Sequence, residues 1–427
     1  MKIVLVVHQF PPEHTGGTEH YTNSLGRSFI EKGHQVDIFV PGPLSHGPEQ
    51  RIVDQDGMRL WQSPSLAEPG TENPAAEFWH SFRNHAAERA FQHMIETVQP
   101  DIVHIQHLQN VSARMIRLAT GRPRLLTLHD YWYFCANGQM IRPDRSPCPG
   151  PRHGWNCVDC AADKAELPSL RRLRPLVAVP FGLRNLYLKN LANEIDLFLA
   201  PSEFLRQQYI NNGYPEKRIQ ILVNGLDTKR IAEVSHVDSC VVKRSDWPET
   251  VDLHLGFIGS IAWQKGVHVL IAAFEQLPPN VAVTIYGDMS VFPEYAQQVR
   301  QMSHHPHVRF VGTVPYDQVG MALRQMDALV VPSIWYENAP LVIQEAYGVG
   351  VPVIASRLGA LTEKVQDGVT GLLFEAGDGE DLSRAIRSLM GDPTLLQRLA
   401  TNITPGPTMK EHVAELLDIY QSFANAF

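Results

Sequence analysis

One stretch decides the fold of this chain: Asp327-Ala-Leu-Val-Val-Pro-Ser333, then Ile-Trp-Tyr-Glu337-Asn-Ala-Pro340-Leu-Val-Ile-Gln-Glu345-Ala-Tyr-Gly348, and, two residues later, Val351-Pro-Val-Ile-Ala-Ser356. An apolar run with strand character leads into a loop that carries Glu337. A helical segment starts near Pro340, and a second apolar run follows it. The pattern predicts a strand, helix, strand crossover. In such parallel units the ligand crevice lies outside the carboxyl ends of the strands, so the Glu337 loop should face it.

The same alternation runs through the whole chain. In the first half, strands are expected at 3–7, 33–40, 101–105, 124–128 and 195–200, with a helix at 18–32. In the second half, strands are expected at 251–258, 281–286, 307–311, 328–331, 351–355 and 371–374. This predicts an α/β protein with two Rossmann-like, doubly wound parallel-sheet domains, at 1–225 and 226–407, and a closing amphipathic helix at 408–427.

Length and charge agree with this organisation. At 427 residues the chain exceeds what one hydrophobic core usually supports. Its formal charge is -8, from 37 basic and 45 acidic residues, so no nucleic acid partner is expected. The apolar run from Met1 to His8 is too short for a signal peptide, and no run reaches the ~20 residues of a membrane span. We therefore expect a cytoplasmic protein, with the inner membrane face as a further location.

Two carboxylates accompany the expected helix start. Amides near Asn338, Ala339 and Leu341 would face an anion, because the first turn of a helix leaves its N–H groups without acceptors. Glu337 in the loop and Glu345 in the helix would flank that anion. An ionised carboxylate offers only acceptors and can take two hydroxyl protons. Phosphate and hydroxyls together indicate a nucleotide sugar.

The Glu-x7-Glu spacing, the Pro340-Leu341 pair and the Gly-Val-Pro-Val-Ile-Ala-Ser run resemble the family 4 retaining glycosyltransferases, which have the GT-B fold of two Rossmann-like domains facing a cleft. The resemblance implies transfer of a hexosyl unit from a nucleotide-diphosphate sugar, with retention of configuration. The acceptor would be a polysaccharide, glycolipid or lipid-linked glycan of the cell surface, such as lipopolysaccharide. We expect no catalytic divalent metal.

Further donor residues follow from the resemblance. Gly16 and Gly17, in the loop after the first strand, would pack against the phosphates and sugar of the donor. Lys265 would offer a compact positive charge to the diphosphate. Where the family usually has an arginine after Gly259, this chain has Ser260, which puts phosphate binding in doubt.

Polar residues at strand ends complete the expected site. The resemblance places His129, in Thr127-Leu-His-Asp130, against the transferring sugar. His129, Glu337 and Lys265 are the predicted catalytic residues. At the end of the neighbouring expected strand, three polar residues would line the acceptor side: His104, Gln106 and His107.

A cysteine-rich insertion is expected at about 135–160. Four of the five cysteines fall there: Cys135, Cys148, Cys157 and Cys160. In a cytoplasmic chain, Cys-x2-Cys with two more cysteines indicates a structural four-thiolate zinc site, with an iron–sulfur cluster as the rival and free thiols as the alternative.

Residues 164–189 carry six basic side chains and one acidic one among apolar residues. This composition fits peripheral contact with an anionic membrane that presents a lipid-linked acceptor, or a solvated basic surface. Pro175 and Pro180 argue against one long interfacial helix.

Two other functions fit the same features. One is a nucleotide-sugar epimerase or phosphorylase of the same fold. The other is a catalytically weak, metal-stapled protein that binds nucleotide sugars or joins a polysaccharide assembly complex, which Ser260 favours.

Overall fold

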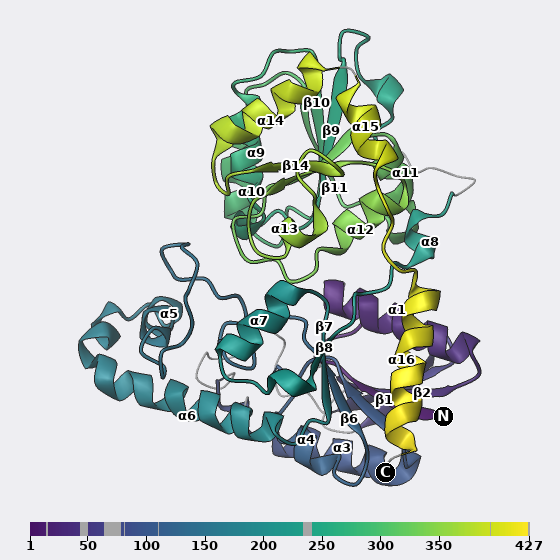
Figure 1. Ribbon diagram of the computed structural model, residues 1–427. Coiled ribbons are helices and arrows are strands. Elements are labelled where there is room, and N and C mark those ends of the chain that lie inside the picture. Colours follow the sequence, from purple (N-terminus) through teal and green to yellow (C-terminus); the bar gives the residue numbers. More distant parts are fainter. Residues whose placement is uncertain are drawn as a thin grey trace. The chain divides into compact units, whose positions relative to one another are not determined.

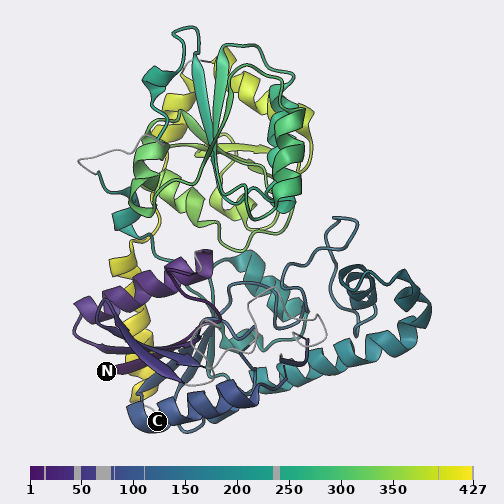
Figure 2. The same cartoon turned by 180° about the vertical axis from the view of Figure 1, so that it is seen from behind.

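The computed structural model describes residues 1–13, 16–42, 50–63, 78–80, 82–109, 111–233, 241–392 and 394–425 (Figures 1 and 2). The chain forms two compact units. The first combines Met1–Asn224 with Met409–Phe427, and the second is Gly225–Thr408. The chain therefore leaves the first unit once and returns to it at its carboxyl end.

The first unit is built on an eight-stranded sheet in the order β3-β4-β2-β1-β5-β6-β7-β8. Its strands are β1 (Lys2–Val6), β2 (Gln35–Pro41), β3 (Arg51–Gln55), β4 (Met58–Ser63), β5 (Ile102–Ile105), β6 (Arg124–Thr127), β7 (Leu197–Ala200) and β8 (Ile219–Ile221). Only β3 pairs antiparallel, with β4. The strand order reverses between β1 and β5, so a ligand crevice is expected at their carboxyl ends.

The helices of the first unit are α1 (Gly17–Glu31), α3 (His85–Val98), α4 (Met115–Leu118), α5 (Cys157–Lys164), α6 (Arg174–Ala192), α7 (Glu203–Asn211) and α16 (Met409–Ala424). The last of these belongs to the core of the unit. Val413, Leu416 and Tyr420 of α16 are fully buried and pack in one cluster with Leu25 and Phe29 of α1. The carboxyl-terminal helix is thus an integral layer of the first unit.

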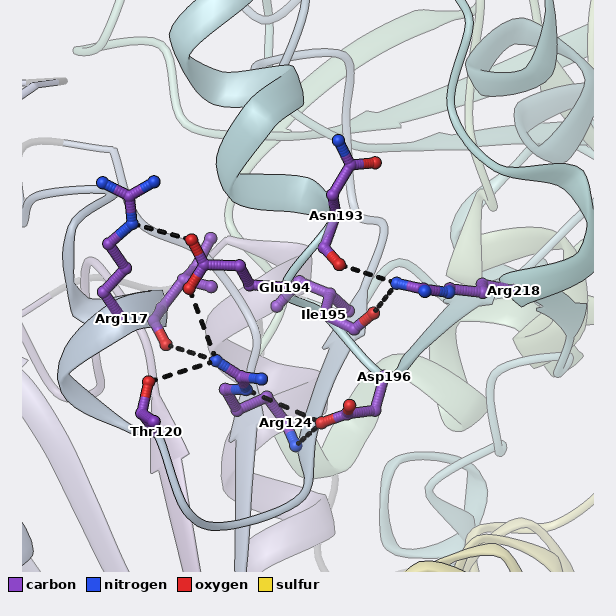
Figure 3. Close-up of polar contacts among 9 residues, drawn as sticks. Arg117, Thr120, Arg124, Asn193, Glu194, Ile195, Asp196 and Arg218 are labelled. Atoms are coloured by element: carbon purple, nitrogen blue, oxygen red, sulfur yellow. Dashed lines mark hydrogen bonds and ion pairs between the residues drawn. The ribbon is translucent and has the colours of Figure 1, made fainter.

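The amino ends of β6 and β7 are closed by a polar network (Figure 3). Arg124 lies 3.6 Å from both Glu194 and Asp196, and Asp196 also accepts the Arg124 backbone N–H at 2.8 Å. Arg117 pairs with Glu194 at 2.7 Å, while Arg218 donates to the carbonyls of residues 193 and 195. These contacts fasten the loops at the amino ends of the strands to one another.

The second unit is a six-stranded parallel sheet in the order β11-β10-β9-β12-β13-β14. Its strands are β9 (Leu253–Ile258), β10 (Val281–Tyr286), β11 (Val308–Gly312), β12 (Ala328–Val331), β13 (Val353–Ser356) and β14 (Gly371–Phe374). Its α-helices are α8 (Thr228–Ile231), α9 (Val267–Phe274), α10 (Pro293–Met302), α11 (Val319–Arg324), α12 (Leu341–Gly348), α13 (Leu361–Lys364), α14 (Gly379–Gly391) and α15 (Leu395–Thr401). The order reverses between β9 and β12, which is the switch point of this sheet.

The expected α/β architecture is confirmed, and its cause is visible in the strands. All six residues of β10 and all four of β12 and β13 are buried, as in a parallel sheet covered by helices on both faces. The β3–β4 hairpin and the short strand β8 were not predicted. The outer strand β3 is largely exposed and lacks the apolar run on which the other predictions rest.

Helix α6 corrects the expectation that two prolines interrupt this segment. It forms one continuous helix (Figure 1). Pro180 lies inside it and Pro175 in its first turn. Pro175 costs no hydrogen bond, because a first-turn amide has no intrahelical acceptor. Pro180 removes one bond, and the burial of Leu188 and Leu191 stabilises the helix against that loss. Among the described residues, no helix is both long and apolar enough to span a bilayer.

Candidate functional site

The centre of the second unit's switch point is an ion pair. Lys265 follows β9 and Glu337 follows β12, the two strands between which the order reverses. Lys265 Nζ lies 2.7 Å from Glu337 Oε1, and Ser333 Oγ donates to the same oxygen at 2.7 Å. The Lys265 ammonium also lies 5.4 Å from the centre of the Trp335 ring. Two predicted catalytic residues are therefore in direct contact.

The two loops that carry this pair are locked together. The Ile334 amide donates to the Gln264 carbonyl at 2.9 Å. Gly266 adopts φ +72°, and any side chain there would collide with the Pro332 carbonyl oxygen. The absence of a Cβ at Gly266 therefore sets how closely Lys265 approaches the loop of Glu337.

Burial and charge act in opposite directions on Glu337. Its side chain is 7% exposed, and burial by itself favours the neutral acid. The nearby Lys265 charge, with hydrogen bonds from Lys265 and Ser333, outweighs burial and lowers the pKa of Glu337. The carboxylate is thus ionised at neutral pH and acts as an acceptor.

The predicted anion-binding amides lie at the start of α12. The helix begins at Leu341, and Pro340 is the residue before it, with φ −66° and ψ 104°, rather than its first helical residue. Glu337 and Asn338 are buried in the loop just before it, next to Ala339. The sequence stretch from Glu337 to Leu341 therefore lies together at the carboxyl side of β12.

Glu345 has a different partner from Glu337. Arg230 of α8 lies 2.7 Å from Glu345 Oε1, and its guanidinium stacks 4.5 Å from the Tyr316 ring centre. Burial raises the pKa of Glu345, and the Arg230 charge opposes this. Arg230 was missed by the sequence analysis, because it lies far from Glu345 along the chain. Ser333 was also missed, although a hydroxyl residue at the end of an apolar run is a signal that could have indicated it.

The glycine and serine after β9 form an exposed turn. Ser260 is exposed, and its carbonyl accepts the Ala262 amide at 2.9 Å. Gly259 continues the strand by donating to the Tyr286 carbonyl at 3.1 Å. Lys265 is the one cationic side chain between Gly259 and Gly266 in this loop.

Histidines collect at the switch point of the first unit. His107, after β5, lies 3.0 Å from Asp130, and its ring centre lies 4.3 Å from that of His8, after β1. His129 Nε2 donates to Gln106 Oε1 at 2.8 Å, with the ring neutral. Burial, with the His107 charge, lowers the pKa of His129 to about 3. His129 is thus a neutral hydrogen-bonding group at neutral pH.

His104 lies elsewhere than expected. It is fully buried within β5, with Nδ1 2.5 Å from Tyr420 Oη and Nε2 2.7 Å from Thr127 Oγ1. Both ring nitrogens are satisfied by the protein, because strand residues alternate between faces and His104 points into the core under α16. It joins β5, β6 and α16 instead of lining an acceptor surface.

Gly16 and Gly17 lie at the start of α1, and both are exposed. A Cβ at Gly17 would meet no atom, whereas one at Gly16 would collide with the Glu19 carboxylate. Glu19 in turn lies 3.6 Å from His8. The glycine pair therefore lies near His8, the histidine of the cluster that follows β1.

The only Asp-x-Asp spacing of the sequence is Asp54-Gln55-Asp56. It lies in the β3–β4 hairpin, where Asp56 pairs with Arg27 at 2.7 Å and Asp54 accepts the Gly57 amide. The four cysteines of the insertion have free thiols and line one cavity. Across the described ranges, no three His, Cys, Asp or Glu side chains stand in an arrangement ready to hold a metal ion.

Two family models match the chain. The model of Glycosyltransferase Family 4 matches residues 15–230, and that of Glycosyl transferases group 1 matches residues 244–404. Glycogen synthase of Mycobacterium tuberculosis is 35% identical over 415 residues, which cover 94% of this chain and 88% of that protein.

Solved structures share the fold at low identity. Sucrose-phosphate synthase from Thermosynechococcus elongatus superposes with a TM-score of 0.74 at 18% identity, covering 100% of both chains. HepE from Anabaena, solved in complex with UDP and glucose, gives a TM-score of 0.62 at 19% identity and covers 100% of this chain and 99% of its own.

Proposed function

Because the chain belongs to glycosyltransferase family 4, we propose that it transfers a hexosyl unit from a nucleotide-diphosphate sugar to a glycan or lipid-linked acceptor of the cell surface, with retention of configuration. The Lys265–Glu337 pair at the second unit's switch point carries this proposal. A cation and an ionised carboxylate held side by side suit a ligand with both a diphosphate and hydroxyls.

The proposed chemistry follows from where charge develops. When the bond from the anomeric carbon to the diphosphate breaks, the leaving group gains negative charge. Lys265 and the amides at the start of α12 stabilise that charge more in the transition state than in the ground state. Glu337 and Glu345 accept hydroxyl protons of the donor. We assign no step to a divalent metal, because Lys265 supplies positive charge and the Asp54–Asp56 spacing is engaged in a hairpin.

The histidine cluster of the first unit is proposed to bind sugar hydroxyls. Neutral His129 is both a donor and an acceptor, and Gln106 and His107 lie within hydrogen-bonding distance of His129 and Asp130, respectively. Exposed Gly17 allows backbone to approach a bulky ligand there.

The outer face of α6 is proposed to contact the membrane that presents the acceptor. Four apolar side chains at helical spacing are more than half exposed: Leu176, Val179, Leu183 and Leu186. Exposed Arg171 and Arg172 precede this stripe. An apolar stripe next to basic residues fits an anionic lipid surface, whereas an ordinary solvated face would be polar.

Calorimetric titration with UDP, GDP and ADP tests the donor site. One nucleotide should bind tightly to the wild type and at least about tenfold more weakly to Lys265→Ala and Glu345→Ala, because each removes a proposed contact. Lys410→Ala, an exposed lysine of α16, is the control and should bind as wild type. Equal affinity in all variants would contradict the site.

Turnover separates the alternatives. A glycosyltransferase releases one nucleoside diphosphate for each sugar that it transfers to the acceptor. An epimerase interconverts nucleotide sugars without releasing it, and a phosphorylase needs phosphate. Binding with no turnover of any donor would favour the assembly protein.

A further inference from the structure

The cysteines of the insertion converge on one point. Cys135 from the segment after β6, Cys148 from the following loop, and Cys157 and Cys160 from α5 all line a cavity of about 30 Å³. A space of this size holds one or two water molecules or a single ion. Four thiols that are distant in sequence therefore share one small cavity.

Three of the thiols lie where they can donate a hydrogen bond to an oxygen, as protonated thiols do. Cys135 lies 2.8 Å from Asn137 Oδ1, Cys148 lies 3.5 Å from the Gly150 carbonyl and Cys160 lies 3.7 Å from the Ile141 carbonyl. A thiol uses its hydrogen in such contacts, and a thiolate bound to a metal has none. Rotation about side-chain torsions redirects a sulfur without moving the backbone, so these contacts describe the metal-free form.

A buried positive charge interacts with two of these cysteines. Arg184 of α6 is 1% exposed, donates to the Trp132 carbonyl at 2.8 Å and stacks 4.8 Å from the Trp132 ring centre. Its Nε has no hydrogen-bond partner, and no carboxylate in the described part of the chain forms an ion pair with it. Cys135 and Cys157 are among the groups that interact with its charge. Burial lowers the pKa of Arg184 to about 10 although Asp130 also interacts with its charge, and a further negative charge nearby would offset part of the cost of burial.

The segment between these cysteines needs an anchor. From residue 135 to α5 it has one isolated bridge, between Ile141 and Pro147, and several non-glycine residues with positive φ. It touches α6 at Gly154, where a Cβ would collide with the Ala178 carbonyl. Turn hydrogen bonds thus hold an irregular segment that includes strained conformations.

We propose that Cys135, Cys148, Cys157 and Cys160 bind one Zn²⁺ as a structural four-thiolate site that fastens the segment after β6 to α5. Binding releases the four thiol protons to solvent, and the resulting site carries a net double negative charge. Arg184 offsets part of that charge. Four protein ligands leave no open position, so the ion takes no part in transfer. The small cavity favours a single ion over a multi-iron cluster.

Metal analysis tests this site independently of transfer activity. Full-length protein, purified with a reductant and without chelator, should contain one zinc per chain. Cys157→Ser and Cys160→Ser should lose it, with affinity reduced by at least about tenfold. Cys240→Ser is the matched control, because Cys240 is the fifth cysteine and its sequence position is 80 residues beyond Cys160. Cys240→Ser should keep the full zinc content.

Titration of the wild type with Co²⁺ tests the site even if the cysteine variants fail to fold. Wild-type protein stripped of metal and titrated with Co²⁺ should develop the thiolate absorption of tetrahedral cobalt at one equivalent, and zinc should displace it. Chelator should lower the melting temperature of the wild type. A chain without bound zinc that gives no cobalt–thiolate spectrum would overturn the proposal, as would iron with acid-labile sulfide in place of zinc.

Discussion

Glu337 and Lys265 show how one residue sets the state of another. The Glu337 carboxylate is buried, so its ionised form depends on the ammonium 2.7 Å away. Since the pKa of Glu337 is lowered from 4.5, the pair stabilises the folded unit above that pH and loses this contribution as pH falls through the folded pKa. The contact at the proposed donor site therefore also stabilises the second unit.

Removal of Lys265 alone should be costly. Lys265→Met leaves a buried carboxylate without its cation, so we expect about 3–5 kcal/mol less unfolding free energy at neutral pH in denaturant titrations. The loss should already shrink as pH falls toward 4.5, because burial without Lys265 raises the pKa of Glu337 in the variant, and it should vanish once the wild-type carboxyl is protonated as well. The double variant Lys265→Met/Glu337→Gln should be more stable than Lys265→Met, because no charge remains buried.

An exposed pair provides the control for this experiment. Arg27 and Asp56 also lie 2.7 Å apart, but their side chains are 36% and 42% exposed. Arg27→Met should cost about 0–1 kcal/mol. If Lys265→Met and Arg27→Met lose the same unfolding free energy, burial of Glu337 does not decide the strength of its pair with Lys265.

At the scale of elements, the predictability of the fold varied with the kind of signal. Buried parallel strands were found from apolar runs alone, as in β10 and β12. Proline misled the prediction for α6, because tertiary burial outweighed local propensity there. The contact of Arg230 with Glu345 could not be predicted, because pairing across distant loops leaves no periodicity in the sequence. Strand-end residues such as His104 were identified as polar, but not the face they occupy.

Helix α6 carries the prediction that belongs to this scale. The protein should co-sediment with vesicles containing anionic lipid, and Leu176→Ser/Leu183→Ser should weaken binding by about tenfold or more, because buried leucine is worth ~1.5–3 kcal/mol. Arg171→Gln/Arg172→Gln should remove about 1 kcal/mol per charge and reduce the dependence on salt.

Two valines give a matched comparison for the stripe. Val179 on α6 is 54% exposed, and Val291 in the second unit is 57% exposed. Val179→Ser should weaken vesicle binding, whereas Val291→Ser should leave it unchanged. Equal effects of the two substitutions would mean that α6 does not contact the membrane. If the wild type did not bind vesicles at all, the proposed membrane contact of this face would be wrong.

At the scale of the molecule, the two units respond to different variables. The first unit holds three deeply buried neutral histidines: burial lowers the pKa of His104 and His129 to about 3 and that of His412 to about 4. In the unfolded chain they titrate near 6.5. The unfolded state therefore binds more protons below that pH, and the first unit loses stability as pH falls from 6.5 toward 4. In the second unit, the pKa of His254 is lowered to about 4.

Scanning calorimetry should accordingly resolve two unfolding transitions, one that depends mainly on pH and one that depends on nucleotide. Acidification from neutral pH to about pH 5 should lower the transition of the first unit more, because three of its described histidines have a pKa lowered to about 3 or 4, compared with one in the second unit. A saturating nucleotide, at about 100 times its dissociation constant, should raise the transition of the second unit by the equivalent of ~2.7 kcal/mol.

Leu416→Ala removes a buried side chain where α16 packs on α1. It should lower only the transition of the first unit, since it removes core packing worth about 2–5 kcal/mol. A single transition that follows both pH and nucleotide would show instead that the units unfold as one cooperative body, with α16 transmitting the loss of either.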